Sequence, residues 1–230
     1  MNHLSTPIFV VIVAGGQGTR MGMALPKQFL EIEGKPILYY TIAAFAKAIP
    51  QAEIILVLPE AEISKLQMVL QHFEHRIELN VVSGGATRYD SVKNGLKGLP
   101  EDSIILVHDG VRPFISETLI QTCIETAMTS GTAIPAINVV DSVRVLSASG
   151  SSPINRDMLR IIQTPQTFQG NILLPAFAQD YQSSFTDEAT VVENMGHKIT
   201  LVEGDKNNIK ITTPEDLQLA ENLMARRKLA

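Results

Sequence analysis

Four short runs of apolar, mostly branched residues recur along the chain, and each is followed by Gly, Pro or Asp and then by a helix-like pattern. The runs are Ile8–Val13, Ile54–Leu58, Ile104–Val107 and Thr132–Ile137. Continuous apolar runs of this length are typical of parallel strands that are buried on both faces of a sheet. The alternation therefore predicts an α/β fold, in which helices cover both faces of a mostly parallel sheet.

Helix-like patterns separate and follow these strands. The predicted helices are Pro36–Lys47, Glu62–Phe73, Tyr89–Lys97, Glu117–Thr129 and Asn171–Asp180. A last helix has the clearest boundaries, because Thr213 can cap it, Pro214 suits its first position and Asp216 lies three residues after the cap. Basic residues at 226–228 end it favourably for the helix dipole.

The composition indicates one globular domain over residues 1–230, since 45% of the residues are hydrophobic and 19% are charged. A net charge of −5 argues against nucleic acid as a partner, because such binding needs a basic surface. Cys123 is the single cysteine, which excludes an intramolecular disulfide and fits a cytoplasmic protein. The apolar run Ile8–Val13 is too short for a signal peptide core or a transmembrane helix, so we expect no membrane association.

Residues 138–157 interrupt the α/β pattern. They are rich in Asp, Ser, Gly and Pro around a short alternation, Ser142–Leu146. This pattern predicts a protruding hairpin or arm.

A glycine-rich loop, Val13–Gly22, directly follows the first strand, where backbone N–H groups can cradle phosphates. Its glycines at 16, 18 and 22 do not have the dinucleotide spacing, and a P-loop signature is missing. Arg20 and Lys27 add the positive charge that a triphosphate requires. The loop alone thus predicts nucleotide binding.

The segments Gly16–Gly22 and Pro26–Leu30 resemble the signature of the sugar-nucleotide pyrophosphorylase-like transferases, and specifically of the 2-C-methyl-D-erythritol 4-phosphate cytidylyltransferases. Further motifs follow in the family's order, from Ala14 to Asp216. The resemblance implies a Rossmann-like, three-layer nucleotidyltransferase fold with a mostly parallel sheet and a β-arm that forms a homodimer. It also implies transfer of a cytidylyl group from CTP to a polyol phosphate, 2-C-methyl-D-erythritol 4-phosphate, with release of pyrophosphate.

The resemblance assigns roles to individual residues. Arg20, Lys27 and Lys210 would be catalytic, and Asp109 would hold Mg²⁺ at the end of its strand, where ligands of α/β sheets bind. Lys210 is expected at the end of a strand. The expected substrate-binding residues are Ala14, Gly15 and Gly16 on the triphosphate, Gly85, Arg88 and Ser91 on the cytidine, Arg112 and Thr186 on the acceptor, and Ser142, Arg156 and Thr164 from the neighbouring subunit.

Asp187 and Glu188 form an adjacent carboxylate pair, which we interpret as acids in the first turn of a helix rather than as a catalytic pair. The rival acceptor is ribitol 5-phosphate, used by related cytidylyltransferases. Thr186–Ala189 matches the methylerythritol phosphate motif and favours that substrate. Rivals of other classes are a nicotinamide-dependent oxidoreductase, which the glycine spacing disfavours, and a non-catalytic nucleotide sensor, which the assembled cations disfavour.

Overall fold

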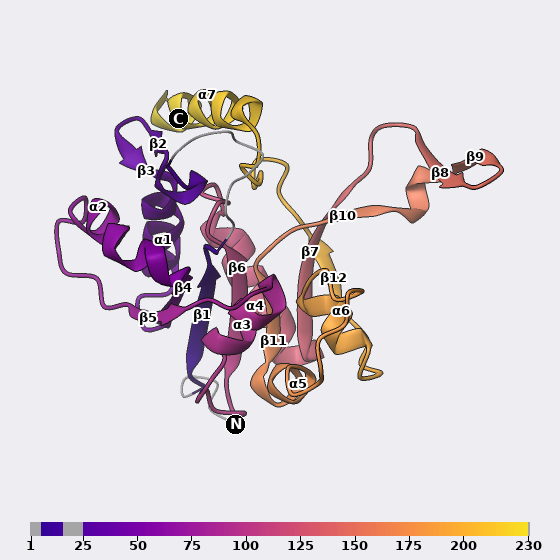
Figure 1. Ribbon diagram of the computed structural model, residues 1–230, viewed down its shortest axis with the longest axis horizontal. Helices are drawn as coiled ribbons and strands as arrows, with labels where there is room; N and C mark the ends of the chain where they lie inside the picture. The colour runs from indigo at the N-terminus through magenta and orange to yellow at the C-terminus, as the bar shows by residue number, and fades with distance from the viewer. Residues whose placement is uncertain (1–5, 16–24, 230) are drawn as a thin grey trace.

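The computed structural model describes residues 6–15 and 25–229. Its main sheet has eight strands in the order β10-β7-β11-β6-β1-β4-β5, with β12 paired to β7 (Figure 1). In chain order these are β1 (Ile8–Val13), β4 (Glu53–Leu58), β5 (Asn80–Ser83), β6 (Ile104–Asp109), β7 (Thr132–Asn138), β10 (Arg160–Ile162), β11 (Gln166–Gln169) and β12 (Leu201–Glu203).

The central strands are parallel. β1 lies between β6 and β4, and Val13 is in register with both Asp109 and Val57. β11 runs antiparallel between β6 and β7. The carboxyl ends of β1 and β6 therefore meet at one edge of the sheet, which brings the chain after Val13 beside Asp109.

Helices cover both faces, as the alternation predicted. One face packs against α1 (Ile37–Ala48) and α4 (Glu117–Ser130). The other packs against α3 (Arg88–Gly95), α5 (Gly170–Ala176) and α6 (Glu188–Glu193). Neighbouring residues of β1 point to opposite faces, so that Val10 and Ile12 join the first core while Val11 and Val13 join the second.

A third small core lies under α7 (Pro214–Leu229), which packs with the hairpin of β2 (Glu31–Ile32) and β3 (Lys35–Pro36). The predicted cap of α7 is confirmed, because Thr213 Oγ1 accepts from Asp216 N at 3.4 Å and the Asp216 carboxylate accepts from Thr213 N at 2.9 Å. Among the described residues, no helix combines the length and the apolar character needed to cross a membrane.

The predicted helix Glu62–Phe73 is helical only as far as Leu70, and most of it is not an α-helix. The segment forms a 3-10 helix, η4 (Glu60–Leu66), and a single α-turn, α2 (Gln67–Leu70). Its core-facing residues Ile63, Leu66 and Val69 are spaced by three, which suits the three residues per turn of a 3-10 helix. The helix predicted to reach Asp180 is shorter, since α5 ends at Ala176.

Residues 138–157 contain a hairpin of β8 (Val143–Ser147) and β9 (Gly150–Ile154). Figure 1 shows it far from the main sheet, at the end of two extended connections. The short 3-10 helix η5 (Arg156–Met158) follows it. Large apolar side chains are exposed here, with Leu146 at 83% and Met158 at 79% relative accessibility.

Candidate active site

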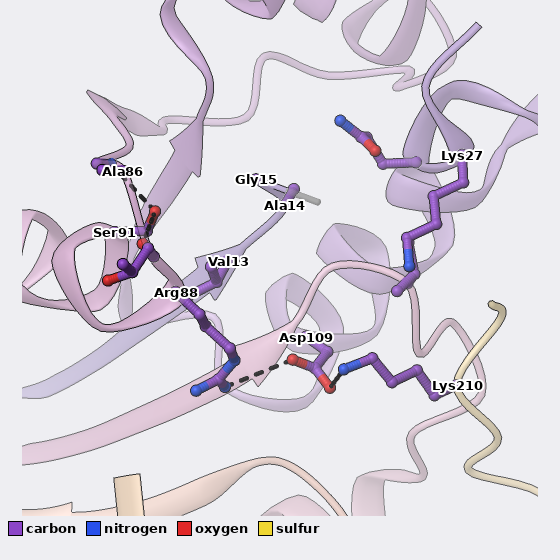
Figure 2. A pocket seen from close by; sticks show the side chains of 13 residues that line it. Val13, Ala14, Gly15, Lys27, Ala86, Arg88, Ser91, Asp109 and Lys210 are labelled. Atoms are coloured by element: carbon purple, nitrogen blue, oxygen red, sulfur yellow. Dashed lines mark hydrogen bonds and ion pairs between the residues drawn. The ribbon is translucent and has the colours of Figure 1, made fainter. Parts of the chain in front are cut away.

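A pocket opens at the carboxyl ends of β1 and β6 (Figure 2). Five parts of the chain form it: the end of β1, the 3-10 helix η3 (Lys27–Phe29), the turn before α3 with the start of that helix, the end of β6, and the segment before α7. The lining residues are Val13, Ala14, Gly15, Lys27, Gln28, Gly85, Ala86, Thr87, Arg88, Ser91, Asp109, Val111 and Lys210. A pocket at this edge is where open α/β sheets bind ligands.

Asp109 is the one carboxylate among the described residues that line the pocket, and three cations contact it. Lys210 Nζ lies 3.0 Å and Arg112 Nε 3.2 Å from its Oδ2, and Arg88 Nη2 approaches Oδ1 at 3.5 Å. Burial raises the pKa of Asp109, but the positive charges of Arg88, Lys210 and Arg112 outweigh it and hold that pKa well below its usual range. Asp109 is therefore a carboxylate at neutral pH.

The turn before α3 presents backbone to the pocket. Thr87 caps α3 by accepting from Asp90 N, and the Asp90 carboxylate returns a bond to Thr87 N. Ser91 Oγ accepts from Gly85 N at 3.1 Å and donates to Thr87 O at 2.9 Å, which closes the turn. A Cβ on Gly85 would lie 2.2 Å from that of Asp90, so only glycine fits there.

Arg88 joins the pocket to α6. Its two terminal nitrogens bind the two carboxylate oxygens of Glu188, with Nη2 to Oε2 at 3.1 Å. Glu188 is fully buried. The interpretation of Asp187 and Glu188 as acids at the start of a helix is confirmed, since Asp187 caps α6 and Glu188 lies in its first turn. The sequence contains no sign, however, that Glu188 would be buried and paired with Arg88.

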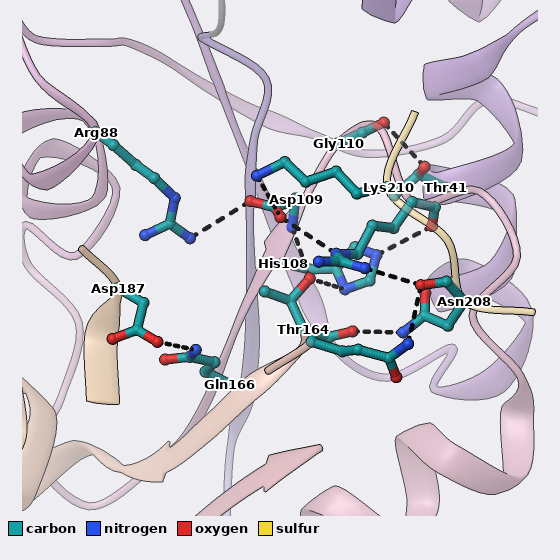
Figure 3. A network of polar contacts seen from close by, with 12 residues as sticks. Thr41, Arg88, His108, Asp109, Gly110, Thr164, Gln166, Asp187, Asn208 and Lys210 are labelled. Carbon is teal, nitrogen blue, oxygen red and sulfur yellow. Dashed lines mark hydrogen bonds and ion pairs between the residues drawn. The ribbon is translucent and has the colours of Figure 1, made fainter. Parts of the chain in front are cut away.

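Behind Asp109 lies a buried polar network (Figure 3). Thr164 Oγ1 accepts from Asp109 N at 3.1 Å and contacts His108 Nδ1 at 3.0 Å. His108 Nε2 lies 3.2 Å from Arg112 O, which requires the proton on Nε2 and makes Thr164 the donor to Nδ1. Burial lowers the pKa of His108 to about 4, so the imidazole is neutral.

The pocket brings together many of the predicted residues: Ala14, Gly15, Lys27, Gly85, Arg88, Ser91, Asp109 and Lys210. Lys27 is only 8% exposed. Gly16 and Arg20 lie outside the described residues.

Other predicted residues are placed differently. Arg112 is buried and directs its Nη1 to Asn208 O at 2.8 Å, so it pairs within the chain. Thr164 is 5% exposed, and its hydroxyl accepts from Asp109 N of the same chain. Thr186 is exposed just before α6, and Ser142 and Arg156 are exposed in and beside the arm, where Arg156 Nη1 donates to Val140 O at 2.6 Å.

The expected strand end at Lys210 is wrong, because β12 stops at Glu203 and residues 204–213 are irregular. Sequence reasoning also missed His108, Glu188 and Asn208 as parts of the site. The sequence offered one sign of the first and the last: His108 adjoins Asp109, and Asn208 lies two residues before Lys210. The sequence does not show that both side chains are buried, because their partner Thr164 lies in a distant segment.

Asp109 fits a single Mg²⁺-binding carboxylate. Its Oδ2 is occupied by two cations, whereas Oδ1 has only the long contact with Arg88 among the described residues. In that part of the chain, no three His, Cys, Asp or Glu side chains gather as a metal cluster. Mg²⁺ is often held by one or two carboxylates together with substrate phosphates, and Asp109 lines the pocket where phosphates would lie.

Comparison with known proteins gives a consistent result. The family model described as 2-C-methyl-D-erythritol 4-phosphate cytidylyltransferase matches residues 8–226. The enzyme of that name from Phocaeicola vulgatus is 45% identical over 94% of this chain and 98% of its own length, and that from Clostridium perfringens is 41% identical over 93% and 97%.

Solved structures agree. That of 4-diphosphocytidyl-2C-methyl-D-erythritol synthase from Anaerococcus prevotii is 30% identical, with a TM-score of 0.81 and 96% of each chain covered. The 2-C-methyl-D-erythritol 4-phosphate cytidylyltransferase of Thermus thermophilus is 34% identical, with a TM-score of 0.72 over 95% of this chain and 98% of that one.

Proposed function

The chain belongs to the 2-C-methyl-D-erythritol 4-phosphate cytidylyltransferase family, and from this premise we propose how its residues perform the reaction. The enzyme transfers the cytidylyl group of CTP to 2-C-methyl-D-erythritol 4-phosphate in the non-mevalonate route to isoprenoid precursors. The observation that carries the assignment of roles is the placement of Asp109 among three cations, opposite the backbone of Gly85–Arg88.

The step is an in-line displacement at phosphorus. A phosphate oxygen of the acceptor forms a bond to the α-phosphorus of CTP, the bond from that phosphorus to the bridging oxygen breaks, and pyrophosphate leaves with the electron pair. The acceptor phosphate is largely a dianion near neutral pH, because its second pKa is about 6, so it attacks without a general base. The protein's contributions are position and positive charge.

The cations of the pocket have different tasks. Lys27, from η3, and Arg20 stabilise the triphosphate, while Lys210, in contact with Asp109, stabilises charge between donor and acceptor. The glycine turn at Gly85 holds the cytidine, and the exposed Thr186 offers its hydroxyl to the acceptor. Asp109 Oδ1 would hold Mg²⁺, which neutralises charge on phosphate oxygens when it is bound.

Beyond the single chain, we propose a cytoplasmic homodimer. The exposed apolar residues Leu146 and Met158 of the arm region support an interface there. Ser142 and Arg156 then reach the partner's pocket, where Arg156 contacts the acceptor phosphate. Thr164 has no such role in this proposal, because it is buried behind Asp109.

Pyrophosphate release tests the function directly. The purified protein is incubated with CTP and Mg²⁺ and with either 2-C-methyl-D-erythritol 4-phosphate or ribitol 5-phosphate. We expect release with the first acceptor and at most a trace with the second. Equal release with both acceptors, or release with ribitol 5-phosphate alone, would overturn the acceptor assignment, and replacing CTP by UTP tests the nucleotide.

A further inference from the structure

Lys210 is carried by residues 204–213, a fully described segment that belongs to neither a helix nor a strand. A catalytic ammonium needs a fixed position, yet this segment lacks the hydrogen-bond ladder of a regular element. Its buried residues are Asn208 and Ile211, which lie on either side of Lys210. Ile211 packs in the third core and its N–H donates to Val111 O at 3.0 Å.

Asn208 is fully buried and makes polar contacts to two distant parts of the chain. Its Nδ2 donates to Thr164 O at 2.8 Å, between β10 and β11. Its backbone carbonyl oxygen accepts from Arg112 Nη1 at 2.8 Å and from Gln163 Nε2 at 3.3 Å. The direction of the amide is determined, since the opposite orientation would place Oδ1 against the Thr164 carbonyl.

These contacts form a closed ring with the reactive groups (Figure 3). Arg112 binds Asn208 O with Nη1 and Asp109 Oδ2 with Nε, and Lys210 binds the same Asp109 oxygen. Thr164 makes a second link, because its hydroxyl accepts from Asp109 N while its carbonyl accepts from Asn208. Asn208 is thus linked to Asp109 by two routes, one from its side-chain amide through Thr164 and one from its backbone oxygen through Arg112. Lys210 follows two residues later.

We propose that Asn208 is a positioning residue for Lys210. The buried side-chain amide of Asn208 fixes this segment, so that the Lys210 ammonium stays 3.0 Å from Asp109, where the transfer requires it. This inference rests on the proposed function and adds a residue to it. A misplacement of about 1 Å in such a site can lower turnover about 100-fold. Asp at position 208 keeps the shape but loses the donor, so Asn208→Asp is as informative as Asn208→Ala.

The test is a double-mutant cycle with Lys210→Ala, and Asn207→Ala is the matched control, since Asn207 is the exposed neighbour in the same segment. We expect Asn208→Ala and Asn208→Asp to lower kcat about 10- to 100-fold, with KM for CTP changed less than about threefold. In the Lys210→Ala background the further loss should be below about twofold, because the group being positioned is already absent.

An equal loss in both backgrounds, or turnover like that of Asn207→Ala, would overturn the proposal. Hydrogen exchange of residues 204–213 supplies a readout that does not need activity: it should accelerate in Asn208→Ala and not in Asn207→Ala, and unchanged exchange also refutes the role. An inactive wild type would count against the proposed function alone. If the Asn208 variants do not fold, Gln163→Ala removes one donor to the same carbonyl, and its kcat should fall about three- to tenfold.

Discussion

In the candidate active site, two carboxylates neutralise three cations. Asp109 accepts from Lys210, Arg112 and Arg88, and Arg88 in turn is neutralised by the buried Glu188. Each cation therefore has a protein carboxylate as its partner before any phosphate arrives. Lys27 lines the same pocket from η3, and we propose that it contacts the triphosphate.

Replacement of Lys27 tests that role. We expect Lys27→Ala to lower kcat about 100- to 1,000-fold, because a charge contact in a dry site is worth several kcal/mol in the transition state. Pyrophosphate release under saturating CTP measures the effect. Lys47→Ala, at an exposed position of α1, should keep full activity, and a Lys27→Ala enzyme within threefold of this control would refute the assignment.

Glu188 gives a prediction about stability. Removal of its carboxylate leaves the Arg88 guanidinium, whose side chain is 31% exposed, without its bidentate partner. We expect Glu188→Ala to lower the free energy of unfolding by about 1–3 kcal/mol, less than for a fully buried pair because Arg88 retains some solvent and Asp109. Urea unfolding measures it, with the exposed Glu193→Ala of the same helix as the control. Equal midpoints for both variants would contradict it.

At the scale of helices and strands, the polar groups that cap a helix contribute to stability, and the pH dependence of the free energy of unfolding tests this for α7. Partial burial raises the pKa of Asp216, but hydrogen bonds from Thr212 and Thr213 outweigh it and hold that pKa below its usual range. A carboxylate with a depressed pKa in the folded state contributes stability above its unfolded pKa, about 3.9, and loses it as the pH falls through the folded value.

Asp216→Ala should therefore lower the free energy of unfolding by about 1 kcal/mol at pH 7. The difference from wild type should shrink as the pH falls below about 4, because the wild-type carboxylate is then protonated too. Urea unfolding between pH 3 and 7 measures this. Glu221→Ala, at an exposed position in the middle of α7, is the control. A difference that is independent of pH would exclude the cap as its cause.

The sequence predicted elements whose signals are local. The strands β1, β4, β6 and β7 are continuous apolar runs, and the capping residues of α7 stand within a few positions of one another. β12 has only three residues, and its alternation of exposed and half-buried positions is too short to recognise. The pairing of Glu188 with Arg88, a hundred residues away in sequence, has no local signal at all.

At the scale of the whole molecule, the hairpin of β8 and β9 stands apart from the three-layer body (Figure 1). Val145 and Leu146 expose 50% and 83% of their surface, which is unfavourable unless another surface covers them. Within the body, three cations already contact Asp109. In the proposed homodimer, the arm adds the exposed cation Arg156, which suits an acceptor phosphate in the second subunit.

Subunit complementation tests this arrangement. Lys27→Ala and Arg156→Ala homodimers should each be nearly inactive, since every site lacks one cation. In an equimolar mixture that has exchanged subunits, half of the dimers are mixed, and each mixed dimer has one site with both native residues if Arg156 acts across the interface. Activity should then recover to about a quarter of wild type. If Arg156 acted in its own subunit, no site would be repaired, so an inactive mixture of exchanged dimers would reject the shared site. Light scattering establishes the dimer first, and Arg144→Ala, within the same arm, is the control that should remain active alone.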